Sequence, residues 1–292
     1  MPKVKVNGIN LYYEIYGSGE SVVFVAGLAA DHNIWGTVLS EFSKKYQVII
    51  FDNRGIGQSD HPDCLYSIEM MADDTIELVE KIGLNKAHFI GSSVGGLIVQ
   101  QIAYKYPRFT KSIVIENSTY KFRSLRLSTI GKSILSLMGK NTYSEEVFKI
   151  VLHFVYSEKF LGSNDALENI TNMVFQSPYQ VAAAGYRGQF NACMTFDSST
   201  WLNKICCPAL VIMSDKDLLV DPAESKELAA QINNAQYYCF KDVGHLPHVE
   251  RPEEFCNVVF EFITKVLGFK YNSSHPPSIV YGEASKDTTM KN

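Results

Sequence analysis

Short apolar runs alternate with longer amphipathic segments over the first part of the chain. A hairpin comes first, in which the turn Asn7-Gly8 joins the apolar stretches Val4–Val6 and Leu11–Tyr16. Strand-like and helix-like segments then alternate, in the order Val22–Val25, Trp35–Phe42, Val48–Phe51, Met70–Ile82, Ala87–Ile90, Gly96–Tyr104 and Ser112–Ile115. This alternation predicts crossover connections and a mostly parallel sheet, which is an α/β fold.

The alternation stops between about Thr119 and Trp201. Apolar residues there recur with helical spacing, as in Val147, Ile150, Val151, Phe154 and Val155. An apolar helical insertion after the sixth strand predicts a lid over an active site. We therefore divide the chain into a first core part (1–118), a helical cap (119–203), a second core part (204–268) and a tail (269–292). The second core part ends with the predicted helix Pro252–Leu267, and the composition of the tail predicts weak order.

A candidate nucleophile follows the apolar run that ends at Ile90. The sequence Gly91-Ser92-Ser93-Val94-Gly95 fits the pattern G-x-S-x-G, in which a serine stands on a sharp turn between a strand and a helix. Side chains two positions before and after that serine would collide with the strand and the helix, and glycine removes them. The pattern predicts that Ser93 presents an exposed hydroxyl at the edge of the sheet.

A serine hydroxyl is a weak nucleophile, so the turn also predicts a base and a carboxylate elsewhere in the chain. The strand-like run Pro208–Met213 is followed by Ser214-Asp215-Lys216-Asp217, and a later run is followed by Gly244-His245. Loops after parallel strands meet at one edge of the sheet. We therefore expect His245 to take the proton of Ser93 and a carboxylate of the earlier loop to orient the imidazole.

Four ordered motifs together resemble the α/β-hydrolase family, from about Lys3 to Leu267. They are the serine turn around Ser93, the segment Phe51–Asp60, the segment Pro208–Asp217 and the pair Gly244-His245. The resemblance implies a mostly parallel central sheet with flanking helices and a helical lid after the sixth strand.

The resemblance also selects the acid. The family motif places it three residues after a small residue that closes the strand, here Ser214, and this implies Asp217. Asp215 is the alternative, whereas Asp221 precedes Pro222 and is expected to cap a helix. Some relatives carry the acid after the sixth strand, but Asn117 there has no carboxylate.

The expected oxyanion hole departs from the common form. Many relatives have His-Gly after the third strand, and this chain has Ala26-Gly27-Leu28. The resemblance implies that backbone N–H groups of Leu28 and Val94 would stabilise the oxyanion. Gly27 and His32 are expected beside the substrate, with packing under the loop as the alternative for His32.

Composition restricts the partners. The 292 residues are 46% apolar and 20% charged, with a net charge of -4 that provides no basic surface for nucleic acid. No stretch reaches the length of a transmembrane helix, the amino terminus has no apolar signal core, and the six cysteines form no C-x-x-C pair. These features favour a cytoplasmic location. His245 and His248 lack a third ligand at metal-like spacing, and Pro247 between them argues against a regular element, so we expect no metal and no cofactor.

The predicted chemistry is acyl transfer to water. The motifs are similar to those of small-molecule carboxylesterases and enol-lactonases, which implies an ester or lactone substrate and an acyl-enzyme intermediate. Two alternatives stay open: an esterase or thioesterase for pimeloyl-type acyl carriers, and a small-ligand sensor that retains the triad and binds a partner protein. A homodimer also stays open.

Overall fold

The computed structural model describes residues 2–122, 124–138, 142, 144–163, 165–268 and 282–283. In this part of the chain the strands form a sheet of order β1-β2-β4-β3-β5-β6-β7-β8-β9. The strands are β1 (Lys3–Val6), β2 (Ile9–Tyr16), β3 (Ser21–Val25), β4 (Gln47–Phe51), β5 (Ala87–Ser92), β6 (Thr110–Glu116), β7 (Ala209–Ser214), β8 (Gln236–Phe240) and β9 (Gly282–Glu283). Neighbours from β4 to β8 pair parallel, and β1, β2 and β9 pair antiparallel. The predicted mostly parallel α/β sheet is confirmed.

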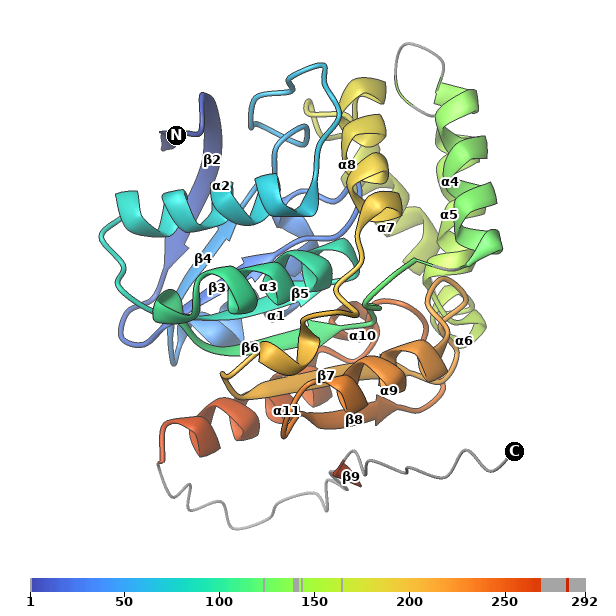
Figure 1. Cartoon of the computed structure of the whole chain (residues 1–292). Helices are drawn as coiled ribbons and strands as arrows, with labels where there is room; N and C mark the ends of the chain where they lie inside the picture. The colour runs from blue at the N-terminus through green and yellow to red at the C-terminus, as the bar shows by residue number, and fades with distance from the viewer. Residues whose placement is uncertain are drawn as a thin grey trace.

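Helices cover both faces of the sheet (Figure 1). α2 (Ile68–Lys81), α3 (Val94–Lys105) and α9 (Pro222–Gln231) bury their apolar faces against one side, together with side chains such as Val23 and Phe89. α1 (Gly36–Ser43) and α11 (Pro252–Val266) bury theirs against the other side. Short 3-10 turns η1 (His32–Trp35), η2 (Pro107–Phe109) and η3 (Leu202–Lys204) complete the core.

A short helix lies where the sequence argued against one. α10 (Pro247–Glu250) begins with Pro247 at its first helical position. Proline is favoured there, because its missing N–H would have no acceptor within the helix and its fixed φ suits the first turn. The expectation that Pro247 prevents a regular element was therefore wrong.

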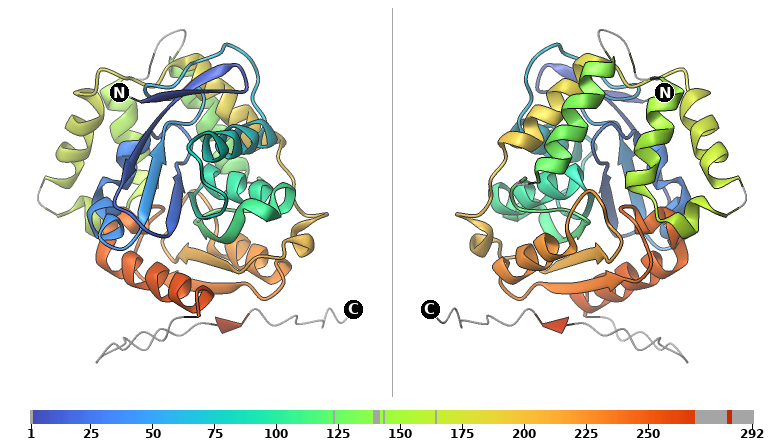
Figure 2. Two further views of the ribbon diagram at one scale, coloured as in Figure 1. Left: turned by 90° about the vertical axis from the view of Figure 1, so that its left-hand side faces the viewer. Right: turned by 90° about the vertical axis from the view of Figure 1, so that its right-hand side faces the viewer.

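The insertion between β6 and β7 contains α4 (Leu125–Met138), α5 (Glu145–Val155), α6 (Glu158–Leu161), α7 (Ala166–Phe175) and α8 (Ala183–Thr195). We call these helices the cap. They gather beyond one end of the parallel strands (Figure 1), and the right-hand view of Figure 2 shows these green and yellow helices in front of the sheet. Their apolar faces form a separate core of residues such as Ile134, Tyr186 and Phe190, which also includes Ile56 of the main domain. Most of the predicted tail lies outside the described residues.

Candidate active site

Ser93 occupies the sharp turn between β5 and α3. Its backbone has φ 53° and ψ -113°, a conformation that a residue with a β-carbon adopts only when its surroundings hold it there. A β-carbon on Gly91 would lie 2.2 Å from the carbonyl oxygen of Gly95, and one on Gly95 would lie 2.0 Å from that of Val25. The backbone N–H of Ser93 donates to the carbonyl of Glu116 at 2.8 Å. The two glycines therefore permit the close packing that keeps Ser93 in its strained turn.

His245 and Asp217 form a buried pair at the ends of neighbouring strands. Nδ1 of His245 lies 2.7 Å from Oδ2 of Asp217. The other carboxylate oxygen, Oδ1, accepts hydrogen bonds from the backbone N–H groups of Leu219 at 2.8 Å and Val220 at 3.0 Å. The carboxylate is therefore fixed by its own loop while one oxygen remains directed at the imidazole.

The electrostatic surroundings favour the protonated form of His245. Burial lowers its pKa, but the negative charge of Asp217, the hydrogen bond to Asp217 and the charge of Glu116 outweigh burial. The net effect raises the pKa of His245 above its ordinary value of 6.5. A raised pKa makes the imidazole a stronger proton acceptor, as a general base requires.

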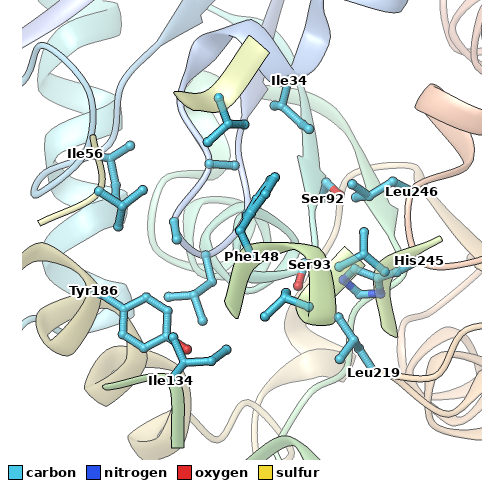
Figure 3. A pocket seen from close by; sticks show the side chains of 18 of the residues that line it. Ile34, Ile56, Ser92, Ser93, Ile134, Phe148, Tyr186, Leu219, His245 and Leu246 are labelled. Atoms are coloured by element: carbon cyan, nitrogen blue, oxygen red, sulfur yellow. The ribbon is translucent and has the colours of Figure 1, made fainter. Parts of the chain in front are cut away.

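Ser93 and His245 line one cavity of about 260 Å³. Figure 3 shows the serine hydroxyl and the imidazole at the same end of this cavity. Asp217 lies behind the imidazole and outside the cavity lining. The structure thus brings together all three residues that the sequence nominated for the triad. Asp215 instead accepts a hydrogen bond from the backbone N–H of Asp242 at 2.7 Å.

Backbone donors lie beside Ser93. Val94 is the first residue of α3, so its N–H has no acceptor within the helix. Gly27 and Leu28 line the cavity, and a β-carbon on Gly27 would lie 3.3 Å from Cβ of Ser93. The next residue, Ala29, has φ 61° and donates its N–H to Oε1 of Gln189 at 3.0 Å. Leu28 lines the cavity and Val94 directly follows Ser93, so both stay candidates for the oxyanion donors.

His32 does not line the cavity. Its ring is buried, with Nδ1 2.7 Å from Oδ1 of Asp52 and Nε2 3.7 Å from Oε1 of Glu14. The same Asp52 oxygen accepts the backbone N–H of His32 at 2.8 Å. These contacts hold the imidazole beneath the loop and turn it away from the substrate space, and they correct the expectation that His32 contacts substrate. Its neighbours Asp31 and Asn33 line the cavity instead.

Most of the cavity wall is aliphatic or aromatic. The cap supplies residues such as Ile134, Phe148 and Tyr186, and the main domain supplies Ile34, Ile56, Leu219 and Leu246 (Figure 3). Among the described residues that line the cavity there is no lysine or arginine, and Asp31 is the single carboxylate. An anionic group on a substrate would therefore meet no lysine or arginine in this lining.

A second histidine and carboxylate pair lies nearby. Nδ1 of His248 is 2.8 Å and 2.9 Å from the two carboxylate oxygens of Glu116, and both residues are fully buried. The ring of His248 packs against Trp35 with ring centroids 4.4 Å apart, so the pair of His248 and Glu116 belongs to the core between β6 and α10. In the described part of the chain, no three histidine, cysteine or acidic residues gather as metal ligands would.

Two polar residues tie the cap to the site and were not identified from the sequence. Gln189 on α8 contacts the loop at Ala29. Glu250 on α10 accepts the backbone N–H groups of Ser157 at 2.8 Å and Gly244 at 3.0 Å. Gln189 and Ala29 are 160 residues apart and Glu250 and Ser157 are 93 apart, and no local sequence pattern marks Gln189 or Glu250.

Comparison with known proteins agrees with the fold described above. The family model described as the alpha/beta hydrolase fold matches residues 20–252. The chain is 26% identical to 3-oxoadipate enol-lactonase 1 of Acinetobacter baylyi over 267 residues, which cover 89% of this chain and 95% of that one.

Solved structures with the same fold also match this chain. The enol-lactonase of Burkholderia xenovorans LB400 superposes with a TM-score of 0.81 at 25% identity, covering 90% of this chain and all of that one (100%). A thermophilic esterase of Thermogutta terrifontis superposes with a TM-score of 0.80 at 26% identity, covering 91% and 99%. In the described residues, no helix has the length and apolar character needed to cross a membrane. The family model matches most of the chain and agrees with the sheet and the serine turn described above. This protein therefore belongs to the α/β-hydrolase fold family.

Proposed function

We propose that the protein is a serine hydrolase that cleaves an uncharged small-molecule ester or lactone through an acyl-enzyme intermediate. The observation that carries this proposal is the buried pair of Asp217 and His245, in which the imidazole lines the same cavity as Ser93 on its strained turn. Relatives named as an enol-lactonase and an esterase support the same class of reaction.

The first half of the reaction forms the acyl-enzyme. Nε2 of His245 takes the proton of the Ser93 hydroxyl while Oγ attacks the carbonyl carbon of the substrate. Asp217 accepts the Nδ1–H bond, which fixes the tautomer and stabilises the imidazolium. The backbone N–H groups of Leu28 and Val94 stabilise the negative charge on the carbonyl oxygen. Collapse of the tetrahedral intermediate breaks the ester C–O bond, and the imidazolium returns its proton to the departing alkoxide.

The second half releases the acid. A water molecule gives a proton to His245 as its oxygen attacks the acyl carbon, and the same two N–H groups stabilise the second tetrahedral intermediate. The bond to Oγ of Ser93 then breaks, and His245 returns the proton to the serine.

The wall of the cavity supports an uncharged, apolar substrate. Burial of an unpaired carboxylate costs several kcal/mol, and the described lining offers no lysine or arginine to pair with one. The aliphatic and aromatic wall can instead take up an acyl chain, and each methylene group buried there stabilises binding by about 0.8 kcal/mol. We therefore place the acyl group under the cap.

A fluorophosphonate probe combined with a panel of esters tests the proposal. The wild type should react with the probe at Ser93 and hydrolyse p-nitrophenyl esters or simple lactones over many turnovers. Ser93→Ala should lose both labelling and hydrolysis, with Ser92→Ala as the neighbouring control. Labelling that persists undiminished at Ser92 in the Ser93→Ala variant would overturn the assignment. Only a single turnover in the wild type would favour the sensor alternative.

A further inference from the structure

The side chain of Gln189 joins the cap to the loop beside the nucleophile. It is fully buried on α8, where Oε1 accepts the N–H of Ala29 at 3.0 Å and Nε2 donates to the carbonyl of Arg54 at 3.1 Å. One partner is a donor and the other an acceptor, so the amide has one orientation that satisfies both. Gln189 therefore holds two loops of the main domain at a fixed separation.

Ala29 is the residue in this loop that most needs such support. Its φ of 61° lies in the left-handed region, which is disfavoured for a residue with a β-carbon. It directly follows Leu28, whose N–H is a proposed oxyanion donor. A residue held in a disfavoured conformation persists when its surroundings determine it, and the hydrogen bond from Ala29 to Gln189 is such a constraint.

Close backbone packing brings α8 to this position. A β-carbon on Gly185 would lie 1.8 Å from the carbonyl oxygen of Gly55, so glycine is needed for the approach. Tyr186, the next residue, lines the cavity (Figure 3), and Gln189 follows three residues later on a neighbouring part of the helix surface. The same helix thus contacts both the substrate space and the loop that contains the proposed oxyanion donor Leu28.

We propose that Gln189 is a positioning residue for the oxyanion hole. The inference rests on the proposed function, because it assumes that Leu28 donates to the oxyanion. The histidine that many relatives have in this loop is replaced by Ala26. Gln189 instead restrains the loop from the cap side and keeps the Leu28 N–H directed at the reacting carbonyl. The cap therefore contributes to the rate of acyl transfer in addition to the choice of substrate.

The test compares Gln189→Met with a control on the same helix. Methionine has a similar length but can neither accept from Ala29 nor donate to Arg54. Because loss of one oxyanion donor costs about 10²–10³ in kcat, a displaced donor should lower kcat by about 10- to 100-fold with KM nearly unchanged. A trifluoromethyl ketone, which forms a tetrahedral adduct with serine, should bind more weakly by a similar factor.

Asn191→Leu is the matched control. Asn191 lies about half a turn further along α8, and its Nδ2 donates to the carbonyl of Tyr66 at 3.1 Å, which is outside the Gly27–Ala29 loop. Its loss should lower the melting temperature and leave kcat unchanged. If Gln189→Met does not fold, Gln189→Ala replaces it, because the smaller side chain leaves space for water.

The outcomes separate this proposal from the proposed function. Ser93-dependent labelling and turnover of the wild type are measured first, and their absence would count against the proposed function itself. With those intact, an unchanged kcat in Gln189→Met would overturn the role of Gln189 alone. Equal losses of kcat in Gln189→Met and Asn191→Leu would also overturn it, because general docking of α8 would then account for both.

Discussion

The backbone N–H of His245 donates to the carbonyl oxygen of Val155 at 2.6 Å. Val155 is the last residue of cap helix α5, so the cap contacts the main chain of the proposed base directly. Asn117 completes this arrangement, because its Nδ2 donates to the carbonyls of Gly244 at 3.1 Å and His245 at 2.9 Å. The position of the imidazole therefore depends on the main domain and the cap together.

Gly244 is needed for this contact. A β-carbon there would lie 2.6 Å from the carbonyl oxygen of Val155 and 2.8 Å from a carboxylate oxygen of Glu250. Gly244→Ala should therefore cost about 1–3 kcal/mol of stability. It should also lower kcat by up to about 10²-fold through a displaced His245. Thermal melting and ester hydrolysis measure both effects. Gly36→Ala is the control, because a β-carbon there meets nothing within 4 Å, and it should leave the melting temperature and kcat unchanged. If Gly244→Ala also left both unchanged, the position of His245 would not depend on this contact.

The acid is tested by two asparagine substitutions in one loop. Asp217→Asn should lower kcat by about 10⁴-fold, because an amide in this position favours the wrong tautomer of His245. Asp215→Asn should change kcat only a few-fold, since Asp215 contacts Asp242 and lies 3.8 Å from Nζ of Lys241. Hydrolysis of a p-nitrophenyl ester measures both variants. A larger loss of kcat in Asp215→Asn than in Asp217→Asn would show that Asp215 is the acid.

The raised pKa of His245 predicts an acidic limit to activity. The base must be neutral, so kcat/KM should fall as the pH drops through a pKa above 6.5. The charge of Glu116 contributes to this shift, and Glu116→Gln should therefore move the inflection to lower pH. The exposed Glu80→Gln is the control and should leave the profile in place. An inflection that moves upward in Glu116→Gln would contradict the electrostatic account.

Phe148 should limit the length of the acyl chain. It lines the cavity from α5 and packs edge-on against Phe175 at 5.5 Å between ring centroids. Phe148→Ala should raise the kcat/KM of long-chain relative to short-chain esters by about 10-fold or more, because space for two or three methylenes is gained. Ile150→Ala on the same helix is the control, since that side chain is 61% exposed. An identical chain-length profile in both variants would place the acyl group elsewhere.

The charge of the acyl group should affect kcat/KM more strongly than its length does. A p-nitrophenyl heptanoate should be hydrolysed about 100-fold or more faster than the adipate half-ester of similar size, because the terminal carboxylate has no lysine or arginine in the described lining to pair with. Met173→Lys adds a cation at a half-exposed position of the lining and should narrow this difference. Equal kcat/KM values for the two esters in the wild type would show that a charged acyl group is accommodated.

Much of the main domain could be predicted from the sequence. The alternation of apolar runs determined the strands, because a strand buried between two helical layers must be apolar over its length. The glycines around Ser93 indicated the sharp turn, since their requirement is local and steric. The helix after the turn begins at Val94 and not at Gly96, because the turn passes directly into helical backbone.

The partners of the buried polar side chains were decided by tertiary structure. His32 was expected beside the substrate, but Asp52, 20 residues later, holds it beneath the loop. Gln189 bonds to Ala29 across 160 residues, and Glu250 bonds to Ser157 across 93. Apolar periodicity indicates which face of a segment is buried, but not which loop that face meets. The sequence alone therefore determined the sheet and nominated the triad, whereas only the packing of the cap on the main domain decided which groups hold it in place.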